Sequence, residues 1–411
     1  MNAPLPMHGA PVDWPVENDT LLVGGVPLPL LAARVGCTPF YAYDRARLAE
    51  RIALLRRHIP REVDLHYAIK ANPMPALVSF MAPLVDGLDV ASGRELRVAL
   101  DAGMPAKEIS FAGPGKSLAE LEQAVAAGVL LNAESPREIR ELARISNRLG
   151  RQARVAVRVN PAFELKSSGM KMGGGPKQFG VDAEAVPDLL REIGRLGLGF
   201  EGFHIYSGSQ NLRAESICDS QRKVFDLAVE LARHAPAPVR TLNVGGGFGV
   251  PYFPGDQALD LAPIGDNLNT LAAEAATKLP QARLVIELGR YIVAEAGVYV
   301  CRVIDRKISR GHVFLVTDGG LHHHLAASGN FGQVIRKNYP VAVAHRVRGG
   351  ERELASVVGP LCTPLDLLGE RMELARADED DLVVVFQSGA YGFTASPHLF
   401  LGHPPPLEVL V

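Results

Sequence analysis

The feature that most constrains the fold is a regular alternation of short apolar runs with amphipathic, helix-like stretches. The runs fall at residues 63–70, 87–92, 108–114, 129–135, 154–161, 199–209, 240–249 and 283–290. One of the intervening stretches, SPREIRELARISNRLG, begins with Ser135 and Glu138 at capping-box spacing. Eight strand–helix units over roughly 250 residues predict an α/β fold of the (β/α)8 barrel type. An open, doubly wound sheet is the alternative.

The pattern changes after residue 290. The segments VYVCRVIDRK, HVFLVTDG, ASVVGPLC and DLVVVFQSG read as strands, and few helical stretches lie between them. Residues 20–29 add a further strand near the start of the chain. We therefore predict a barrel over residues 40–290 and a β-domain built from residues 1–39 and 291–411.

Composition narrows the classes of partner. The chain has 411 residues, 47% of them apolar, and a formal net charge of -2, which gives no reason to expect nucleic acid or an anionic membrane. Its 4 cysteines form no C-x-x-C pair, which favours neither a zinc site nor a disulfide framework. Residues 1–16 lack the features of a signal peptide, and the apolar stretch 291–304 is too short to span a bilayer. We expect a cytoplasmic protein that acts on a small molecule.

Polar residues and glycines gather where the predicted barrel strands end, which is the face where barrel enzymes carry out their chemistry. They are Lys70, Asp89, Ser92, Arg158, Ser209, Gly245 to Gly249, Glu287 and Arg290.

Two of these features have both a simple and a functional interpretation. Lys70 ends the first strand, where it is either a solvated cap or a Schiff-base lysine in a shielded pocket. Gly245, Gly246 and Gly247 follow the seventh strand, as a tight turn or as a loop whose N–H groups bind phosphate. The position after the seventh strand favours phosphate. GPGKS at 113–117 lacks the first glycine of a nucleotide P-loop, so we interpret it as a loop before a helix.

Glu287 and Arg290, in ELGR, end the eighth strand. They form either a surface ion pair or part of a cofactor site. In the second case Glu287 keeps a pyridine nitrogen protonated, and Arg290 binds a phosphate or carboxylate.

The order of eight motifs carries a family resemblance. YAIKAN, DVASGREL, RVNP, GSQ, GGGFG, ELGR, GPLC and GAYG occur as they do in the diaminopimelate and ornithine decarboxylases, which depend on pyridoxal 5'-phosphate. The resemblance covers nearly the whole chain and implies an alanine-racemase-type barrel with a C-terminal β-domain. It implies that Lys70 forms the internal aldimine and that Glu287 supports the quinonoid. The other residues it places around the cofactor are Asp89, Arg158, Tyr206, Ser209, Gly245, Gly246, Gly247, Gly289, Arg290 and Tyr391.

The same resemblance implies a homodimer in which Cys362 reaches the neighbouring subunit's site and protonates the product. The residues it places near the substrate are Arg290, Cys362, Thr363, Asp366, His322, His323 and Tyr391. Three positions depart from the family pattern. Tyr206 replaces a histidine that stacks on the cofactor, Thr363 replaces an acidic residue that reads a distal ammonium, and Ala326 falls where an arginine is expected.

The departures at Thr363 and Ala326 fit a narrower resemblance. MKMGGGPKQFG, HIYSGSQNL, DGGLHHH and GPLCTPLDLLG resemble the decarboxylases of glutamyl groups on acyl carrier proteins and those found beside exosortase genes. The resemblance implies a carrier-linked substrate, with Lys166, Lys171 and Lys177 facing an acidic carrier. We expect no metal at His322 to His324, because consecutive residues do not converge easily on one ion. The alternatives are a diaminopimelate decarboxylase proper, a racemase on the same barrel, and an inactive relative that acts as a binding protein.

Overall fold

A computed structural model describes residues 14–163, 170–171, 173–331 and 337–411. The chain divides into two compact units. The first, called here the β-domain, comprises residues 1–49, 251–257 and 292–411, and the second, called the barrel, comprises residues 50–250 and 258–291.

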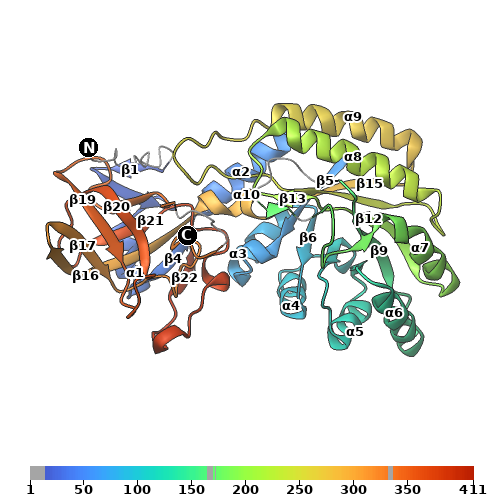
Figure 1. Ribbon diagram of the computed structural model, residues 1–411, viewed down its shortest axis with the longest axis horizontal. Coiled ribbons are helices and arrows are strands. Elements are labelled where there is room, and N and C mark those ends of the chain that lie inside the picture. Colours follow the sequence, from blue (N-terminus) through green and yellow to red (C-terminus); the bar gives the residue numbers. More distant parts are fainter. Residues whose placement is uncertain (1–13, 164–169, 172, 332–336) are drawn as a thin grey trace. The chain divides into compact units, whose positions relative to one another are not determined.

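The barrel is a closed ring of parallel strands (Figure 1). Each strand pairs in parallel with the next along the chain, and the last pairs with the first, with Glu287 opposite His66. This closure confirms the predicted (β/α)8 barrel and excludes the open sheet. Its strands are β5 (Val63–Ala68), β6 (Gly87–Val90), β7 (Ile109–Phe111), β8 (Leu130–Ala133), β9 (Arg154–Asn160), β12 (Gly199–His204), β14 (Thr241–Gly246) and β15 (Arg283–Leu288).

Helices connect the strands and lie outside them (Figure 1). They are α2 (Arg45–His58), α3 (Pro75–Met81), α4 (Gly93–Asp101), α5 (Leu118–Ala127), α6 (Pro136–Leu149), α7 (Val186–Arg195), α8 (Ala214–Ala232), α9 (Ala262–Lys278) and α10 (Arg290–Val293). Short 3-10 helices are η1 (Ile69–Ala71), η2 (Ala82–Leu84), η3 (Ala106–Glu108), η4 (Ala183–Ala185), η5 (Ala294–Ala296), η6 (Phe393–Ala395) and η7 (Phe400–Gly402).

Serine side chains cap the starts of α5 and α6, with one correction to the predicted pattern. Ser117 and Glu120 form a complete capping box at the start of α5. At the start of α6, Ser135 accepts a hydrogen bond from the Glu138 N–H, as the sequence predicts. The Glu138 carboxylate, however, accepts from the Glu134 N–H and from Lys116, so the predicted box is only half formed.

The long connection after β9 adds two small pairings. β11 (Val181–Asp182) runs parallel to β9 beside its C-terminal end. β10 (Met170–Lys171) pairs antiparallel with β13 (Gly208–Ser209), which follows β12. The connection therefore folds back to the strand ends, and one of its strands lies beside Ser209.

The β-domain holds α1 (Leu28–Val35) and two sheets. The smaller sheet is β1 (Val16–Glu17), β2 (Thr20–Val23) and β3 (Val26–Pro27). The larger contains β4 (Phe40–Tyr43), β16 (Gly297–Ser309), β17 (His312–Thr317), β18 (Val341–Val343), β19 (Arg352–Val358), β20 (Leu367–Ala375), β21 (Leu382–Val385) and β22 (Leu407–Leu410). Trp14, Leu28, Phe40, Val298 and Phe386 belong to its buried core, so both ends of the chain contribute to one domain.

Candidate active site

Each of the eight barrel strands contributes at least one buried polar side chain near its C-terminal end. Paired residues of neighbouring strands face the same way, as Glu287 and His66 do. The residues that alternate with them are mostly apolar, as expected where helices cover the outer face. The polar residues therefore line the inside of the barrel, and each is at most 8% exposed. We call them the polar ring: His66, Asp89, Ser110, Asn132, Arg158, His204, Asn243 and Glu287.

Glu287 has two partners in the polar ring. His204 Nε2 lies 2.9 Å from Glu287 Oε2, and the Asn243 amide donates to the same oxygen over 3.0 Å. Burial alone would raise the pKa of Glu287, but His204, Lys70 and Arg158 outweigh burial and hold that pKa well below 4.5. Glu287 is therefore a fixed anion inside the barrel, which is the state needed to keep a pyridine nitrogen protonated.

Asp89 is held by a histidine that the sequence analysis does not single out. His66 Nδ1 lies 3.2 Å from Asp89 Oδ1, and both side chains are buried. Burial alone would lower the pKa of His66, but Asp89, Asp64 and Glu287 outweigh burial and raise it above 6.5.

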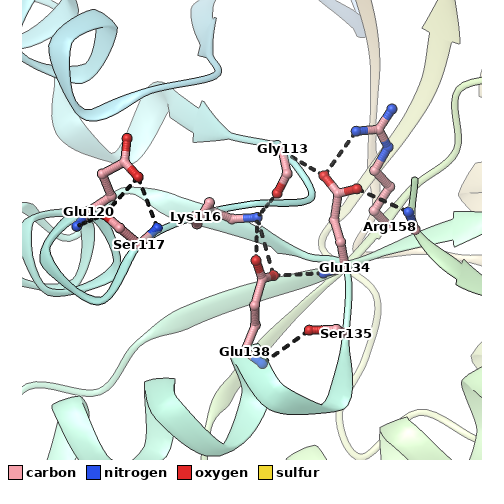
Figure 2. Close-up of polar contacts among 9 residues, drawn as sticks. Gly113, Lys116, Ser117, Glu120, Glu134, Ser135, Glu138 and Arg158 are labelled. Carbon is pink, nitrogen blue, oxygen red and sulfur yellow. Dashed lines mark hydrogen bonds and ion pairs between the residues drawn. The ribbon is translucent and has the colours of Figure 1, made fainter. Parts of the chain in front are cut away.

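Arg158 is fixed by a chain of buried charges that runs outward to α6 (Figure 2). Its guanidinium donates to Glu134 Oε1 over 2.9 Å, and the Gly180 N–H donates to the other oxygen of Glu134. Burial opposes ionisation of Glu134, yet Arg158, Lys116 and two backbone N–H groups lower its pKa below 4.5. Beyond it, Lys116 Nζ lies 3.1 Å from Glu138 Oε1, with side-chain exposures of 1% and 2%. Lys116 of GPGKS thus supports the barrel wall.

Lys70 directly follows β5, in the short helix η1. Lys70 is exposed, and its Nζ atom lies 5.7 Å from the centre of the Tyr206 ring. The structure therefore brings the predicted anchoring lysine and the predicted stacking aromatic close together.

The glycine loop at the end of β14 is packed too tightly for side chains. A Cβ atom on Gly246 would lie 2.0 Å from the Glu287 carbonyl oxygen, and one on Gly247 would lie 2.3 Å from the Gly208 carbonyl oxygen. Gly245 and Gly247 also have positive φ angles of 77° and 76°. The loop thus lies against the strand end that carries Glu287 and against the segment that carries Ser209.

Gly289 belongs to the same cluster of strand ends. A Cβ atom there would lie 2.9 Å from the Ala68 carbonyl oxygen, two residues before Lys70, and Arg290 begins α10 next to it. The barrel thus gathers the segments of Lys70, Glu287, the glycine loop and Arg290 at one end. These groups fit pyridoxal phosphate: the amine suits its aldehyde, the buried anion suits its ring nitrogen, and the loop of backbone N–H groups suits its phosphate.

The remaining predicted residues belong to the β-domain, and their part at the barrel site stays a prediction. Cys362 is exposed, and Thr363 Oγ1 accepts a hydrogen bond from the Leu365 N–H over 3.4 Å. Tyr391 has a positive φ of 53°, and its ring lies 6.1 Å from that of Phe331. Both Asp366 oxygens accept backbone hydrogen bonds of 2.7 Å, one from Leu321 and one from Leu361.

The three consecutive histidines are buried and differ in their contacts. His324 donates from Nε2 to Ser388 Oγ over 2.9 Å, because its Nδ1 accepts from the Ala327 N–H. His323 donates from Nε2 to the Pro404 carbonyl over 2.8 Å, which leaves Nδ1 to accept from Tyr299. Among the described residues, neither ring nitrogen of His322 has a hydrogen-bond partner. Burial lowers the pKa of His322 and His324 to about 3 and that of His323 to about 4, so all three are neutral near pH 7.

The described part of the chain has neither a metal-binding cluster nor a membrane-spanning helix. No group of three or more His, Cys, Asp or Glu side chains there is arranged to hold a metal ion. No helix in those ranges is both long enough and apolar enough to cross a membrane. Lys166, one of the lysines predicted to face a carrier protein, lies outside the described residues.

Sequence reasoning missed His66, Asn243 and Glu134. The alternation of strand residues was the available signal, because His66 lies four positions before Lys70 and Asn243 two positions before Gly245. Counting inward positions back from the strand ends would have marked the first two. Glu134 lies just beyond β8, where only the fold shows that it meets Arg158.

The known proteins that this chain resembles are decarboxylases. Residues 45–294 match the family model for the pyridoxal-binding domain of pyridoxal-dependent decarboxylases. The chain is 41% identical to the L-glutamyl-[BtrI acyl-carrier protein] decarboxylase of Niallia circulans, over 91% of this chain and 88% of that protein. It is 32% identical to the diaminopimelate decarboxylase of Aquifex aeolicus, over 96% and 91% of the two chains. The crystal structure of Helicobacter pylori diaminopimelate decarboxylase with L-lysine is 27% identical, with a TM-score of 0.82 over 93% of this chain and 94% of that one.

Proposed function

Because this chain belongs to the family of pyridoxal-dependent decarboxylases, and so is a carboxy-lyase that uses pyridoxal phosphate, we propose that its substrate is a glutamyl group carried on an acyl carrier protein. The observation that carries the proposal is the 41% identity, over 91% of this chain, to a decarboxylase named for that substrate. The sequence resemblance to the same subgroup agrees with it.

The contacts of the β-domain support a substrate whose distal end is uncharged. Thr363 offers only a hydroxyl where the diamino-acid decarboxylases have an acid. Asp366, the nearest carboxylate after Cys362, has each oxygen within 2.7 Å of a backbone N–H. A buried ammonium left without a carboxylate partner costs several kcal/mol, so a free diamino acid is disfavoured, whereas a thioester carries no distal charge.

Each barrel residue then has a chemical task. The cofactor, when bound, accepts the electron pair left behind as carbon dioxide departs. Lys70 would hold the cofactor covalently through its amine, Glu287 would keep the ring nitrogen protonated, and Tyr206 would offer an aromatic face to the ring. The glycine-loop N–H groups, Ser209, Gly289 and Arg290 would bind the phosphate, and the family resemblance adds Tyr391 of the β-domain.

The last step of the proposal is a proton transfer. The Cys362 thiol of the partner subunit gives a proton to the carbon that lost its carboxyl group, which requires a homodimer. The role of Cys362 and the dimer rest on the family resemblance, with Thr363, Asp366, His322 and His323 placed near the substrate by the same argument.

The test is carbon dioxide release from five substrates: glutamyl-carrier protein, free glutamate, meso-diaminopimelate, ornithine and lysine. We expect kcat/KM for glutamyl-carrier to exceed that for every free amino acid by at least about a hundredfold, the scale on which an unpaired buried charge discriminates. A diamino acid that is the best substrate by that margin would reject the proposal and favour a diaminopimelate-type decarboxylase, the function named for the Aquifex relative.

A further inference from the structure

The contact between His66 and Asp89 has no role in the function proposed above. We propose that His66 is a positioning residue, which holds Asp89 through one carboxylate oxygen and keeps the other, Oδ2, as a buried acceptor for a hydrogen-bond donor of the bound cofactor. The proposal depends on the cofactor that the family uses and not on the carrier-linked substrate.

The strands fix the His66 ring in one place. His66 pairs with Gly87 across β5 and β6, and Ala68 pairs with Asp89 two residues further along. A Cβ atom on Gly87 would lie 2.4 Å from His66 Nε2, so the ring lies directly over this glycine. From there Nδ1 reaches Asp89 Oδ1 at 3.2 Å. A glycine is required at position 87 for the ring to lie along β6 and meet Asp89.

The second oxygen of Asp89 is evidence that the site receives a ligand. Asp89 is 8% exposed, and Oδ2 is buried without a hydrogen-bond partner among the residues that the structure describes. A buried carboxylate oxygen without a donor costs free energy, so a site that keeps one is expected to receive a donor when it fills. The position favours the cofactor as the source, because Ala68, the partner of Asp89, is two residues before Lys70.

The charges around His66 are mostly negative. Asp89 faces it from β6, Glu287 from β15 and Asp64 from its own strand, and together they raise the pKa of His66 despite burial. A protonated His66 with an ionised Asp89 makes a pair with no net charge. When His66 loses its proton, the pair loses one positive charge, which changes the electric field at the strand ends where the cofactor would bind.

The test measures cofactor affinity, by titrating the apoprotein with pyridoxal phosphate and following absorbance. His66→Phe keeps a ring but removes the donor, whereas His66→Asn keeps a donor near the place of Nδ1. We expect the dissociation constant to rise at least about tenfold in His66→Phe and to stay within about threefold in His66→Asn, as for the loss and retention of a charge-assisted hydrogen bond. In an Asp89→Asn background, His66→Phe should have no further effect, because it acts through Asp89.

A second experiment measures the visible absorbance of the bound cofactor as a function of pH. A contact with only a structural role would not change this pH profile. The wild type should show an inflection above pH 6.5 that His66→Asn lacks. Wild-type affinity in Asp89→Asn would mean that Oδ2 faces only water, and would overturn the proposal. So would an unchanged inflection in His66→Asn, or a full effect of His66→Phe in the Asp89→Asn background. If His66→Phe does not fold, His66→Asn and Asp89→Asn still decide the question.

Discussion

His204 Nε2 and Glu287 Oε2 lie 2.9 Å apart inside the barrel, although β14 separates their strands. Asn243, on β14, donates to the same oxygen of Glu287. The carboxylate is therefore oriented from two strands and held ionised before any cofactor binds.

Replacing Glu287 with glutamine keeps the side-chain size but removes the charge. We expect kcat to fall by at least about a hundredfold, as for loss of a preorganised electrostatic contact, while cofactor affinity changes only a few-fold. Glu230→Gln, on the exposed face of α8, is the matched control and should behave as wild type. Steady-state kinetics at full cofactor occupancy measure the difference. Unchanged turnover in Glu287→Gln would remove Glu287 from the chemistry.

The buried pair of Lys116 and Glu138 should matter for stability. Lys116→Met leaves the Glu138 carboxylate buried without its cation, so we expect a loss of about 3–5 kcal/mol in the free energy of unfolding. The exposed pair of Lys107 and Glu108 is the control, and Lys107→Met should cost less than about 1 kcal/mol.

Adding Glu138→Gln to Lys116→Met tests the reason for that loss. The double variant removes the orphaned charge and retains an oxygen for the Glu134 N–H, so it should recover part of the stability. Urea unfolding of all four proteins measures the effect. Equal, small losses in Lys116→Met and Lys107→Met would show that the buried charge is compensated elsewhere.

Thr363 offers a test of substrate charge. If the absence of an acid at this position disfavours diamino acids, Thr363→Glu should raise kcat/KM for diaminopimelate relative to glutamyl-carrier by about tenfold or more. Thr363→Gln matches the size of the new side chain without its charge and should not shift the ratio. A shift of equal size in both variants would attribute the change to shape.

The buried histidines of the β-domain predict a dependence of stability on pH. Burial lowers the pKa of His324 to about 3, below the unfolded value near 6.5, so the unfolded chain binds more protons between these pH values. The stability that neutral His324 contributes is present above pH 6.5 and is lost as pH falls toward 3.

Melting temperatures from pH 7 down to pH 5 measure this effect. They should fall less steeply in His324→Gln than in the wild type, whereas exposed His234→Gln should follow the wild-type slope. Parallel slopes in all three proteins would mean that His324 titrates alike in the folded and unfolded states.

The barrel could be predicted from the sequence because its signal is repeated. Eight apolar runs, each followed by a helical pattern, leave few topologies, and the closure between β15 and β5 confirms the barrel. The end of each strand was also readable, so the sequence placed Lys70, Glu287 and the glycine loop correctly at the ends of β5, β15 and β14, whereas their roles stay predictions. The cofactor followed from the order of motifs, and the family match confirms it.

Partners within the site were harder to predict, because they depend on register between strands that are distant in sequence. Glu138 illustrates this: local spacing predicted a reciprocal cap with Ser135, but its carboxylate bonds to Lys116 across 22 residues. The His66–Asp89 contact also depends on the pairing of β5 with β6, which periodicity alone does not specify.

The most direct test of the account is to identify the lysine that carries the cofactor. The holoprotein is reduced with borohydride and digested, and the modified peptide is sequenced by mass spectrometry. We expect the label on Lys70, and we expect Lys70→Ala to lose the visible cofactor band and several orders of magnitude of activity, while Lys107→Ala, at an exposed lysine, keeps both. A label on another lysine, or an intact visible band with the label elsewhere in Lys70→Ala, would contradict the account.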